Sequence, residues 1–269
     1  YRRAAELCRE RYAHGRATRL LARAIACLGT VDVATRIHLW QELGTAFEQK
    51  GDYESALQAF EKVVRLSWVV ASRDKAAQAL LAIGRLWRTR GDLQLAMDYL
   101  TRAQGLFGQS QDSAGVADAR DGIGQVMSWR GKYSEALDHC AAALEVRRRL
   151  GDRRKVASSL MHIGDIERHR GLLDAAESCY KEALALRQQE GLKAEVASVQ
   201  DLMGVLAFLR GDDTAARRLW EEGLALTEET GATGVRVRVL GHLGELYLSQ
   251  GQLPEAEAQI NLARGLAQE

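Results

Sequence analysis

The fold of this chain is decided by residues 40–63, which read WQELGTAFEQKGDYESALQAFEKV. Apolar and small side chains recur in this stretch at spacings of three, four and seven, as they do on one face of an α-helix. Gly51 interrupts the pattern near its middle. The stretch therefore predicts two amphipathic helices, one over about 35–50 and one over about 54–69, joined by a turn at the glycine.

The same pattern returns every forty residues along the chain. Its first helix carries a glycine near the middle in six copies: Gly44, Gly84, Gly124, Gly164, Gly204 and Gly244. A second glycine follows seven residues later in each copy: Gly51, Gly91, Gly131, Gly171, Gly211 and Gly251. An alanine then opens the apolar face of the second helix: Ala56, Ala96, Ala136, Ala176, Ala216 and Ala256. Three aligned columns indicate an internal repeat, and a repeat of this length predicts an all-α array of stacked helical hairpins.

The two glycine columns need different explanations. Gly51 stands just past a helix end, where a positive φ is common and a Cβ would be strained. Gly44 stands inside a helix, where glycine costs roughly 1 kcal/mol relative to alanine, so we expect another part of the hairpin to approach closely there. The small residues Ala56 and Val63 on the second helix are the expected partners. Bulky residues such as Phe60 are then expected to face the next hairpin.

Charge and hydropathy exclude several classes of protein. The 269 residues include 37 basic and 36 acidic side chains, so the net charge is +1 and the basic excess of a nucleic-acid binder is missing. No run free of charged residues exceeds nine, whereas a membrane-spanning helix needs about 20 apolar residues. We therefore expect no nucleic-acid partner and no membrane span.

The cysteines and the first residues bear on the compartment. Cys8, Cys27, Cys140 and Cys179 form no CxxC pair, and each falls in a helical pattern. This usage predicts reduced core thiols in a cytoplasmic protein. The chain begins at Tyr1 and shows no apolar signal-peptide core, so we expect it to be a fragment of a longer protein.

The repeat resembles the tetratricopeptide repeat (TPR). The residues that carry the resemblance in the first full unit are Trp40, Leu43, Gly44, Phe47, Gly51, Ala56, Phe60 and Val63. The last unit matches equally well, through Leu240, Leu243, Gly244, Tyr247, Gly251, Ala256, Ile260 and Ala263. Three units depart from the family at or near the large positions of the first helix: the third at Arg120, the fourth at Glu167, and the fifth at Gln200 and Ala207. The resemblance implies a right-handed α-solenoid, the TPR superhelix.

The forty-residue period is longer than the family's usual one. The proline that closes the shorter repeat is missing, and the only proline, Pro254, lies in the opening turn of a second helix. The longer period is similar to the subclass of the polarity adaptor LGN/Pins and of TPR domains in bacterial signalling proteins. HEAT repeats share the period, but they lack the arrangement of two glycines and an alanine.

The repeats divide the chain evenly. We expect one solenoid over 1–269, with six repeats at 31–70, 71–110, 111–150, 151–190, 191–230 and 231–269. Residues 1–30 are expected to form a degenerate pair, with Ala4–Tyr12 as a first helix and Ala17–Leu28 as a second.

The resemblance also implies where a ligand binds. In the family the first helix of each hairpin lines a concave groove, which holds a peptide or a partner protein. The expected groove residues of this chain are Arg85, Arg88, Asp121, Gln125, Trp129, Asp165, Arg168, His169, Asp201, Val205, Phe208, Leu209, Glu245 and Leu248. This surface is charged in the middle of the chain and apolar toward its end.

The charged groove residues allow two interpretations. Arg85, Arg88 and Arg168 suit the acidic side chains or the terminal carboxylate of a peptide, through charge-assisted hydrogen bonds. Alternatively, the arginines pair with Asp118 and Asp121 of the next hairpin in a solvated network that contributes little. The asparagine–lysine clamp of chaperone-binding family members is missing at the matching positions, which are Gln41, Thr45, Leu81 and Arg85.

The apolar groove residues also allow two interpretations. Trp129, Phe208, Leu209 and Leu248 are anchor sites for a partner if they are exposed, and core residues if their neighbours cover them.

Catalytic and metal chemistry find little support in the sequence. His162, Asp165 and His169 project from one side of a helix, but no HExxH motif and no i, i+4 histidine pair accompany them. There is no phosphate-binding loop and no nucleophile elbow. We therefore expect no metal, no cofactor and no enzymatic activity.

Three functional hypotheses remain open. The first is a non-catalytic scaffold or adaptor that binds a peptide or partner domain in its groove. The alternative is a regulatory or effector-sensing segment of a larger signalling enzyme, such as a kinase, ATPase or protease. The third is self-association through terminal repeats, whose ends need polar caps.

Overall fold

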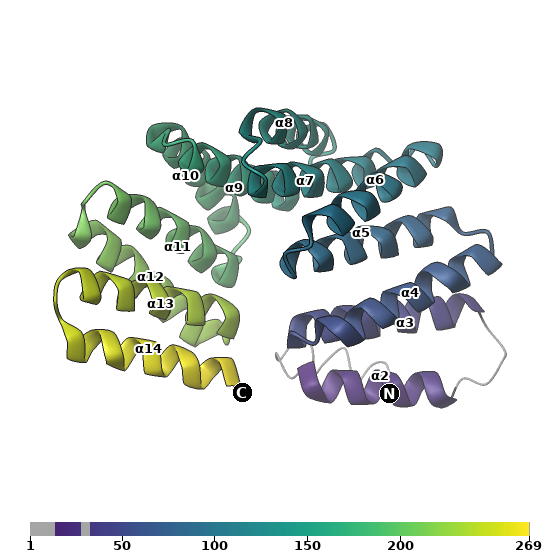
Figure 1. The fold of residues 1–269 in the computed structure, drawn as a ribbon, viewed down its shortest axis with the longest axis horizontal. Coiled ribbons are helices and arrows are strands. Elements are labelled where there is room, and N and C mark those ends of the chain that lie inside the picture. The colour runs from purple at the N-terminus through teal and green to yellow at the C-terminus, as the bar shows by residue number, and fades with distance from the viewer. Residues whose placement is uncertain (1–13, 28–32, 269) are drawn as a thin grey trace. The chain divides into compact units, whose positions relative to one another are not determined.

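The computed structural model describes residues 14–27 and 33–268, and all the regular secondary structure in these ranges is helical (Figure 1). A first helix, α2 (His14–Cys27), precedes the repeats. The first helices of the hairpins, called A helices below, are α3 (Val33–Lys50), α5 (Arg73–Thr89), α7 (Ser113–Trp129), α9 (Arg153–His169), α11 (Lys193–Leu209) and α13 (Thr233–Ser249). The second helices, called B helices, are α4 (Tyr53–Val69), α6 (Leu93–Gln109), α8 (Tyr133–Arg149), α10 (Leu173–Gln189), α12 (Asp213–Thr230) and α14 (Leu253–Gln268).

The observed bounds agree with the expected ones. The first hairpin, α3 and α4, begins and ends within two residues of the positions that the periodicity predicts. Helix α2 confirms most of the helix expected over 17–28, whereas the helix expected over 4–12 lies outside the described residues.

Two compact units, Tyr1–Leu150 and Gly151–Glu269, divide the chain at the boundary between two predicted repeats. In the first unit each helix from α2 to α8 packs against the next, and in the second unit each helix from α9 to α14 does the same. Each unit is therefore a stack of helical hairpins, and the fold is an all-α solenoid. One continuous solenoid over 1–269 stays a prediction.

Aspartate caps start many of these helices, a feature that the periodicity does not reveal. The side chain of Asp92 accepts a hydrogen bond from the backbone N–H of Leu95 at 2.9 Å. The same contact recurs at four more helix starts, those after Asp52, Asp112, Asp152 and Asp212. Such a cap satisfies one of the unpaired N–H groups of the first turn and stabilises a helix by about 1 kcal/mol.

The glycine inside each A helix makes room for the side chain sixteen positions later, which is large in every repeat except that of Cys140. A Cβ on Gly44 would lie 2.8 Å from the ring of Phe60, and a Cβ on Gly164 would lie 2.5 Å from the ring of Tyr180. The same contact recurs in every repeat with the residue sixteen positions later. The expected contact of the bulky residues with the next hairpin is also observed, since Phe60 packs with Ala79 and Ile83 of α5. These side chains lie over the glycine of their own hairpin as well, and the missing methyl group lets the two helices pack closely.

The turns differ in how they accommodate a positive φ. Between the A and B helices of one hairpin, a glycine such as Gly51 takes φ of 81°. Between successive hairpins the same conformation is taken by Gly151, Gly191 and Gly231 in the later copies. In the two earlier copies it falls on Ala71, with φ of 53°, and on Gln111, with φ of 57°. A side chain in this region is strained by roughly 1–2 kcal/mol.

We predict that Ala71→Gly raises the free energy of unfolding by roughly 0.5–1 kcal/mol, because the strain relieved exceeds the entropy that glycine adds to the unfolded chain. Chemical denaturation followed by circular dichroism measures this change. The matched control is Ala225→Gly, in the exposed middle of α12, which should lose about 0.5–1 kcal/mol. A loss of stability in both variants would contradict the strain at position 71.

The cysteines differ in how deeply they are buried. Cys140 is buried and Cys179 is half-buried, but Cys27 is exposed because it lies at the very end of α2. Cys8 lies outside the described residues. Among the helices of the described ranges, none is both long and apolar enough to cross a membrane.

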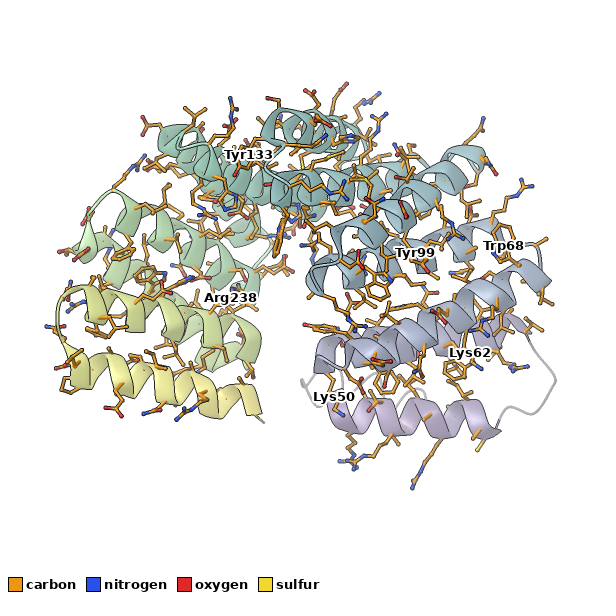
Figure 2. The ribbon with its side chains drawn as sticks, in the orientation of Figure 1. Lys50, Lys62, Trp68, Tyr99, Tyr133 and Arg238 are labelled. Carbon is orange, nitrogen blue, oxygen red and sulfur yellow. The ribbon has the colours of Figure 1, made fainter. Side chains whose placement is uncertain are left out.

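Two large apolar side chains are exposed on B helices of the two units. Trp68, at the C-terminal end of α4, is 50% exposed and is labelled in Figure 2. Ile260 on α14 occupies the position that Phe60 and Trp220 occupy in other repeats. It is 42% exposed, whereas Phe60 and Trp220 are buried. Self-association remains a prediction.

Candidate functional site

The A helices form the surface on which the predicted groove residues lie. Three pairs of successive A helices pack against each other: α3 with α5 and α5 with α7 in the first unit, and α11 with α13 in the second. We call the solvent-facing side of these helices the A-helix surface and describe it separately for the two units.

In the first unit, the predicted arginines lie on α5. The guanidinium of Arg85 is exposed and lies 3.7 Å from the carboxylate of Glu48 on α3. Arg88 is half-buried, and burial lowers its pKa, assisted by repulsion from Arg85. The charges of Asp121 and Glu48 act in the opposite direction. Arg85 therefore has an acidic neighbour on α3, and Arg88 has acidic neighbours on both α3 and α7.

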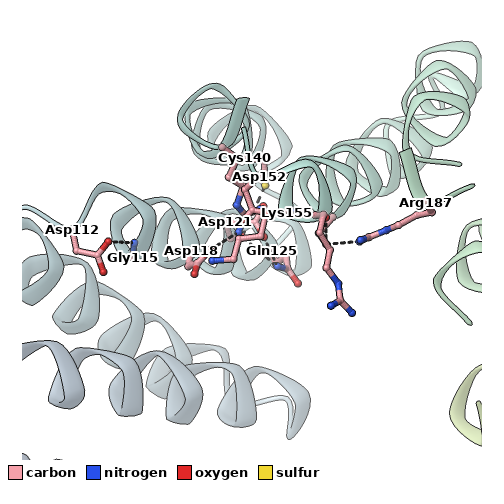
Figure 3. Close-up of polar contacts among 12 residues, drawn as sticks. Asp112, Gly115, Asp118, Asp121, Gln125, Cys140, Asp152, Lys155 and Arg187 are labelled. Carbon is pink, nitrogen blue, oxygen red and sulfur yellow. Dashed lines mark hydrogen bonds and ion pairs between the residues drawn. The ribbon is translucent and has the colours of Figure 1, made fainter. Parts of the chain in front are cut away.

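The carboxylates of α7 are held by an arginine that the groove prediction does not include. Arg147, on the B helix α8, lies 2.9 Å from Asp118 and 3.4 Å from Asp121, and its side chain is almost fully buried. Gln125 donates a hydrogen bond to Asp121 at 3.2 Å (Figure 3). The expected pairing of Arg85 and Arg88 with these two carboxylates is therefore not the principal one. The main partner comes from beneath the surface, because helix α8 packs directly under α7.

The thiol beneath this cluster is not activated. Cys140 is buried beside the backbone oxygen of Asp121, and desolvation, together with the nearby Asp121 charge, raises its pKa far above the usual value. A thiol in this state packs as a small apolar group.

Trp129 provides the apolar part of the first unit's A-helix surface. Its side chain lies at the last residue of α7 and is 62% exposed. An exposed tryptophan beside charged residues is the type of side chain that anchors a partner.

In the second unit, the predicted residues of α9 contact one another. Asp165 accepts a hydrogen bond from the Tyr180 hydroxyl at 2.7 Å and lies 3.6 Å from Arg168. His169 lies 3.1 Å from Arg168, and burial and the Arg168 charge lower its pKa. Burial and Asp165 raise the pKa of Tyr180 above the usual range, so the phenol stays a hydrogen-bond donor.

Asp201 on α11 is the centre of a buried polar cluster. Its carboxylate lies 2.7 Å from Nδ1 of His242 and 3.3 Å from Nε of Arg238, both on α13. Figure 2 labels Arg238 on this helix. The indole N–H of Trp220 donates to the backbone oxygen of Asp201, and the His242 ring stacks on the indole. This cluster ties α11, α12 and α13 together, so Asp201 has a structural role beneath the surface.

The predicted apolar anchors of the second unit divide into two groups. Val205 and Phe208 pack against the core around Trp220. Leu209 is 53% exposed and Leu248 is 47% exposed, at the ends of the neighbouring helices α11 and α13. Both leucines are therefore open to a partner. The remaining predicted residue, Glu245, is exposed on α13.

A pocket of about 360 Å³ opens on the second unit, and its most buried charged residue was not predicted. Arg187 enters it from the B helix α10, Glu195 and Ser198 line it from α11, and α9 contributes Arg154 together with Ser158, Met161 and His162. The sequence analysis did not predict Arg187 because groove residues were expected on A helices alone. The sequence does mark this position. The equivalent B-helix residues of other repeats, Ser67, Phe107, Arg147 and Thr227, are all buried, so an arginine at position 187 is expected to be buried as well.

The structure adds no metal site to this description. Within residues 14–27 and 33–268, no group of three or more histidine, cysteine or acidic side chains is placed to hold a metal ion. His162 lines the pocket, whereas Asp165 and His169 contact Arg168.

Comparison with solved structures finds the same fold in several proteins. The Rap conjugation gene regulator of the plasmid pLS20, in complex with the Phr* peptide, has a TM-score of 0.79 at 14% identity, covering 98% of this chain and 72% of that one. The apo form of RapI has a TM-score of 0.75 at 12% identity and covers 100% of this chain and 96% of its own. BtubC from P. vanneervenii has a TM-score of 0.62 at 21% identity, over 80% of this chain and 90% of that one. At these identities the likeness concerns the fold.

Family comparison agrees with the repeat analysis. No match to this chain is found among curated protein sequences. Two family models, each described as a tetratricopeptide repeat, match residues 42–112 and 115–189 and together cover more than half of the chain. With the glycine columns and the hairpin architecture, these matches show that the chain belongs to the tetratricopeptide repeat family.

Proposed function

We propose that this protein is a non-catalytic interaction module whose A-helix surface binds a peptide or an extended segment of a partner protein. The observation that carries the proposal is the pair of exposed leucines, Leu209 and Leu248, on neighbouring A helices of the second unit. Apolar side chains of this size remain in water at a cost, and a partner that covers them gains the free energy of their burial.

Two further observations support the proposal. The exposed leucines share the second unit with a polar pocket, so one face combines apolar anchors with hydrogen-bonding groups, as peptide-binding surfaces do. One of the proteins with a similar fold was solved with a bound peptide, the Phr* peptide of the pLS20 regulator. A segment of several residues that carries both an apolar and a polar side chain is the kind of ligand that fits.

The leucines provide the test. Peptides are first selected against the full chain from a random library, and their affinity is measured by fluorescence polarisation. We predict that Leu209→Ala combined with Leu248→Ala weakens the binding of the selected peptides by about tenfold or more, because two apolar anchors are truncated.

The control is a second pair of exposed leucines in the same unit. Leu172 and Leu253 are 47% and 64% exposed but lie at the starts of B helices. The double variant Leu172→Ala with Leu253→Ala should bind the peptides as the parent chain does. Equal affinity for the parent chain and both double variants would contradict binding at the A-helix surface.

A further inference from the structure

The buried arginines Arg147 and Arg187 occupy the same position in two consecutive hairpins, forty residues apart. Each comes from the last turn of a B helix and is almost fully buried. A buried guanidinium is costly unless carboxylates and hydrogen-bond acceptors surround it. The two hairpins can therefore be compared by how each neutralises its arginine.

In the hairpin of α7 and α8, the charge of the arginine is neutralised by carboxylates. Two carboxylates of the same hairpin contact Arg147, Asp118 at 2.9 Å and Asp121 at 3.4 Å. One positive charge therefore meets two negative charges.

In the hairpin of α9 and α10, the corresponding positions have no carboxylate. Forty residues after Asp118 and Asp121 stand Ser158 and Met161. The Ser158 hydroxyl accepts a hydrogen bond from Nη2 of Arg187 at 2.8 Å, but it brings no charge.

The only carboxylate that contacts Arg187 within the described part of the second unit is Glu195, on the next A helix. Arg154 contacts the same carboxylate. Two guanidinium groups thus share one acidic side chain. Burial lowers the pKa of Arg187, and the repulsion from Arg154 adds to this effect, while Glu195 and the more distant charge of the exposed Glu190 oppose it.

The pocket of about 360 Å³ lies beside these two arginines and the glutamate that they share. Its lining includes Ser158 and Met161, which replace the aspartates, together with both arginines. The Arg154 side chain is 65% exposed and is accessible to a ligand, whereas Arg187 contributes its charge from within the wall. The Ser158 and Ser198 hydroxyls and the His162 ring add polar groups around the opening.

We propose that this pocket binds one carboxylate group of the peptide ligand, in the place that Asp118 and Asp121 occupy in the preceding hairpin. The inference rests on the proposed function and names the ligand's chemistry. A monoanion fits best, because the side chains that line the pocket include two arginines and one glutamate, which leave a single positive charge within the lining. A dianionic phosphate would bring excess negative charge next to Glu195.

The carboxylate has two possible sources in a peptide, an acidic side chain or the C-terminus. Three synthetic probes separate them: acetyl-Ala-Ala-Glu-Ala-Ala-amide, its Gln analogue, and acetyl-pentaalanine with a free C-terminus. Titration of each into the full chain is followed by NMR at the His162 ring signal and the Arg side-chain N–H signals. We expect one of the two carboxylate probes to bind at least about tenfold more tightly than the Gln probe, the ratio typical of a charge-assisted hydrogen bond.

The decisive variant is Ser158→Asp, which installs the carboxylate that the preceding hairpin carries. It should reduce the preference for the carboxylate probe to about twofold or less without lowering the melting temperature. The matched control is Ser178→Asp, on the exposed side of α10, which should keep the preference. A second variant, Arg154→Gln, should weaken the carboxylate probe by about tenfold and leave the Gln probe unchanged.

The outcomes separate this inference from the proposed function. Equal binding of all three probes, or a preference that survives Ser158→Asp, overturns the carboxylate pocket and leaves peptide binding intact. No binding of any probe at millimolar concentration also overturns the pocket, while the library selection decides independently whether the chain binds peptides.

Discussion

Replacing Trp220 with alanine is expected to lower the free energy of unfolding by about 3–5 kcal/mol, the range found when a large buried aromatic side chain is truncated. Trp220 is 1% exposed and packs against Val239, Leu243 and Leu246 of α13 within one core cluster. Its indole lies over Gly204, where a Cβ would collide with it. The variant removes a large apolar volume from the contact between α11, α12 and α13. Gly204, which lies beneath the indole, has no side chain that could fill the cavity.

Chemical denaturation followed by circular dichroism measures the loss. Trp68→Ala is the control, because that tryptophan is half exposed at the end of α4, and it should change the stability by no more than about 0.5 kcal/mol. The account of the hairpin core would be contradicted if Trp220→Ala cost no more than the control.

Replacing Arg147 with alanine is expected to cost about 3–5 kcal/mol, because one side of a buried ion pair is removed and its carboxylates lose their principal cation. Arg147 is 5% exposed, and Asp121 beside it is 4% exposed. The Asp121 carboxylate is out of reach of water, whereas the Asp118 side chain is 23% exposed and stays partly hydrated. The loss therefore reflects the desolvation of these groups as well as the lost attraction.

The control for this prediction lies two residues further along the same helix. Arg149 pairs with Glu145 at 3.7 Å, and both side chains are about 70% exposed. Arg149→Ala should change the stability by no more than about 0.5 kcal/mol, as exposed ion pairs do. Similar losses in both arginine variants, measured in the same denaturation experiment, would show that the buried pair has no special role.

The fold was predictable because the repeat pattern is built on backbone geometry. Gly51 and its counterparts fix the turn after each A helix through their positive φ, and Gly44 and its counterparts fix the closest approach of the two helices. Such requirements tolerate few residue types, so they leave aligned columns in the sequence. The expected alanine does lie against the inner glycine, as Ala136 does at Gly124, but the larger side chain that covers the glycine, such as Phe60 at Gly44, was not expected there.

The candidate site was less predictable. The family resemblance placed Trp129, Leu209 and Leu248 on the A helices, but whether they are exposed was left open and is seen only in the structure. Arg147 and Arg187 were missed because they belong to B helices and extend beneath the A-helix surface. Periodicity shows which face of a helix a residue occupies, but not how far a long side chain extends. Only the contacts to Ser158 and Glu195 reveal that the charge of Arg187 is incompletely matched.

The central claim, that a peptide binds on the A-helix surface, is tested most directly by photo-crosslinking. A library-selected peptide that carries a benzophenone group is bound to the full chain, irradiated, and the attached residues are identified by mass spectrometry. We predict crosslinks to α9, α11 and α13 of the second unit, near the pocket and the exposed leucines. Crosslinks confined to the B helices α10, α12 and α14 would contradict the claim.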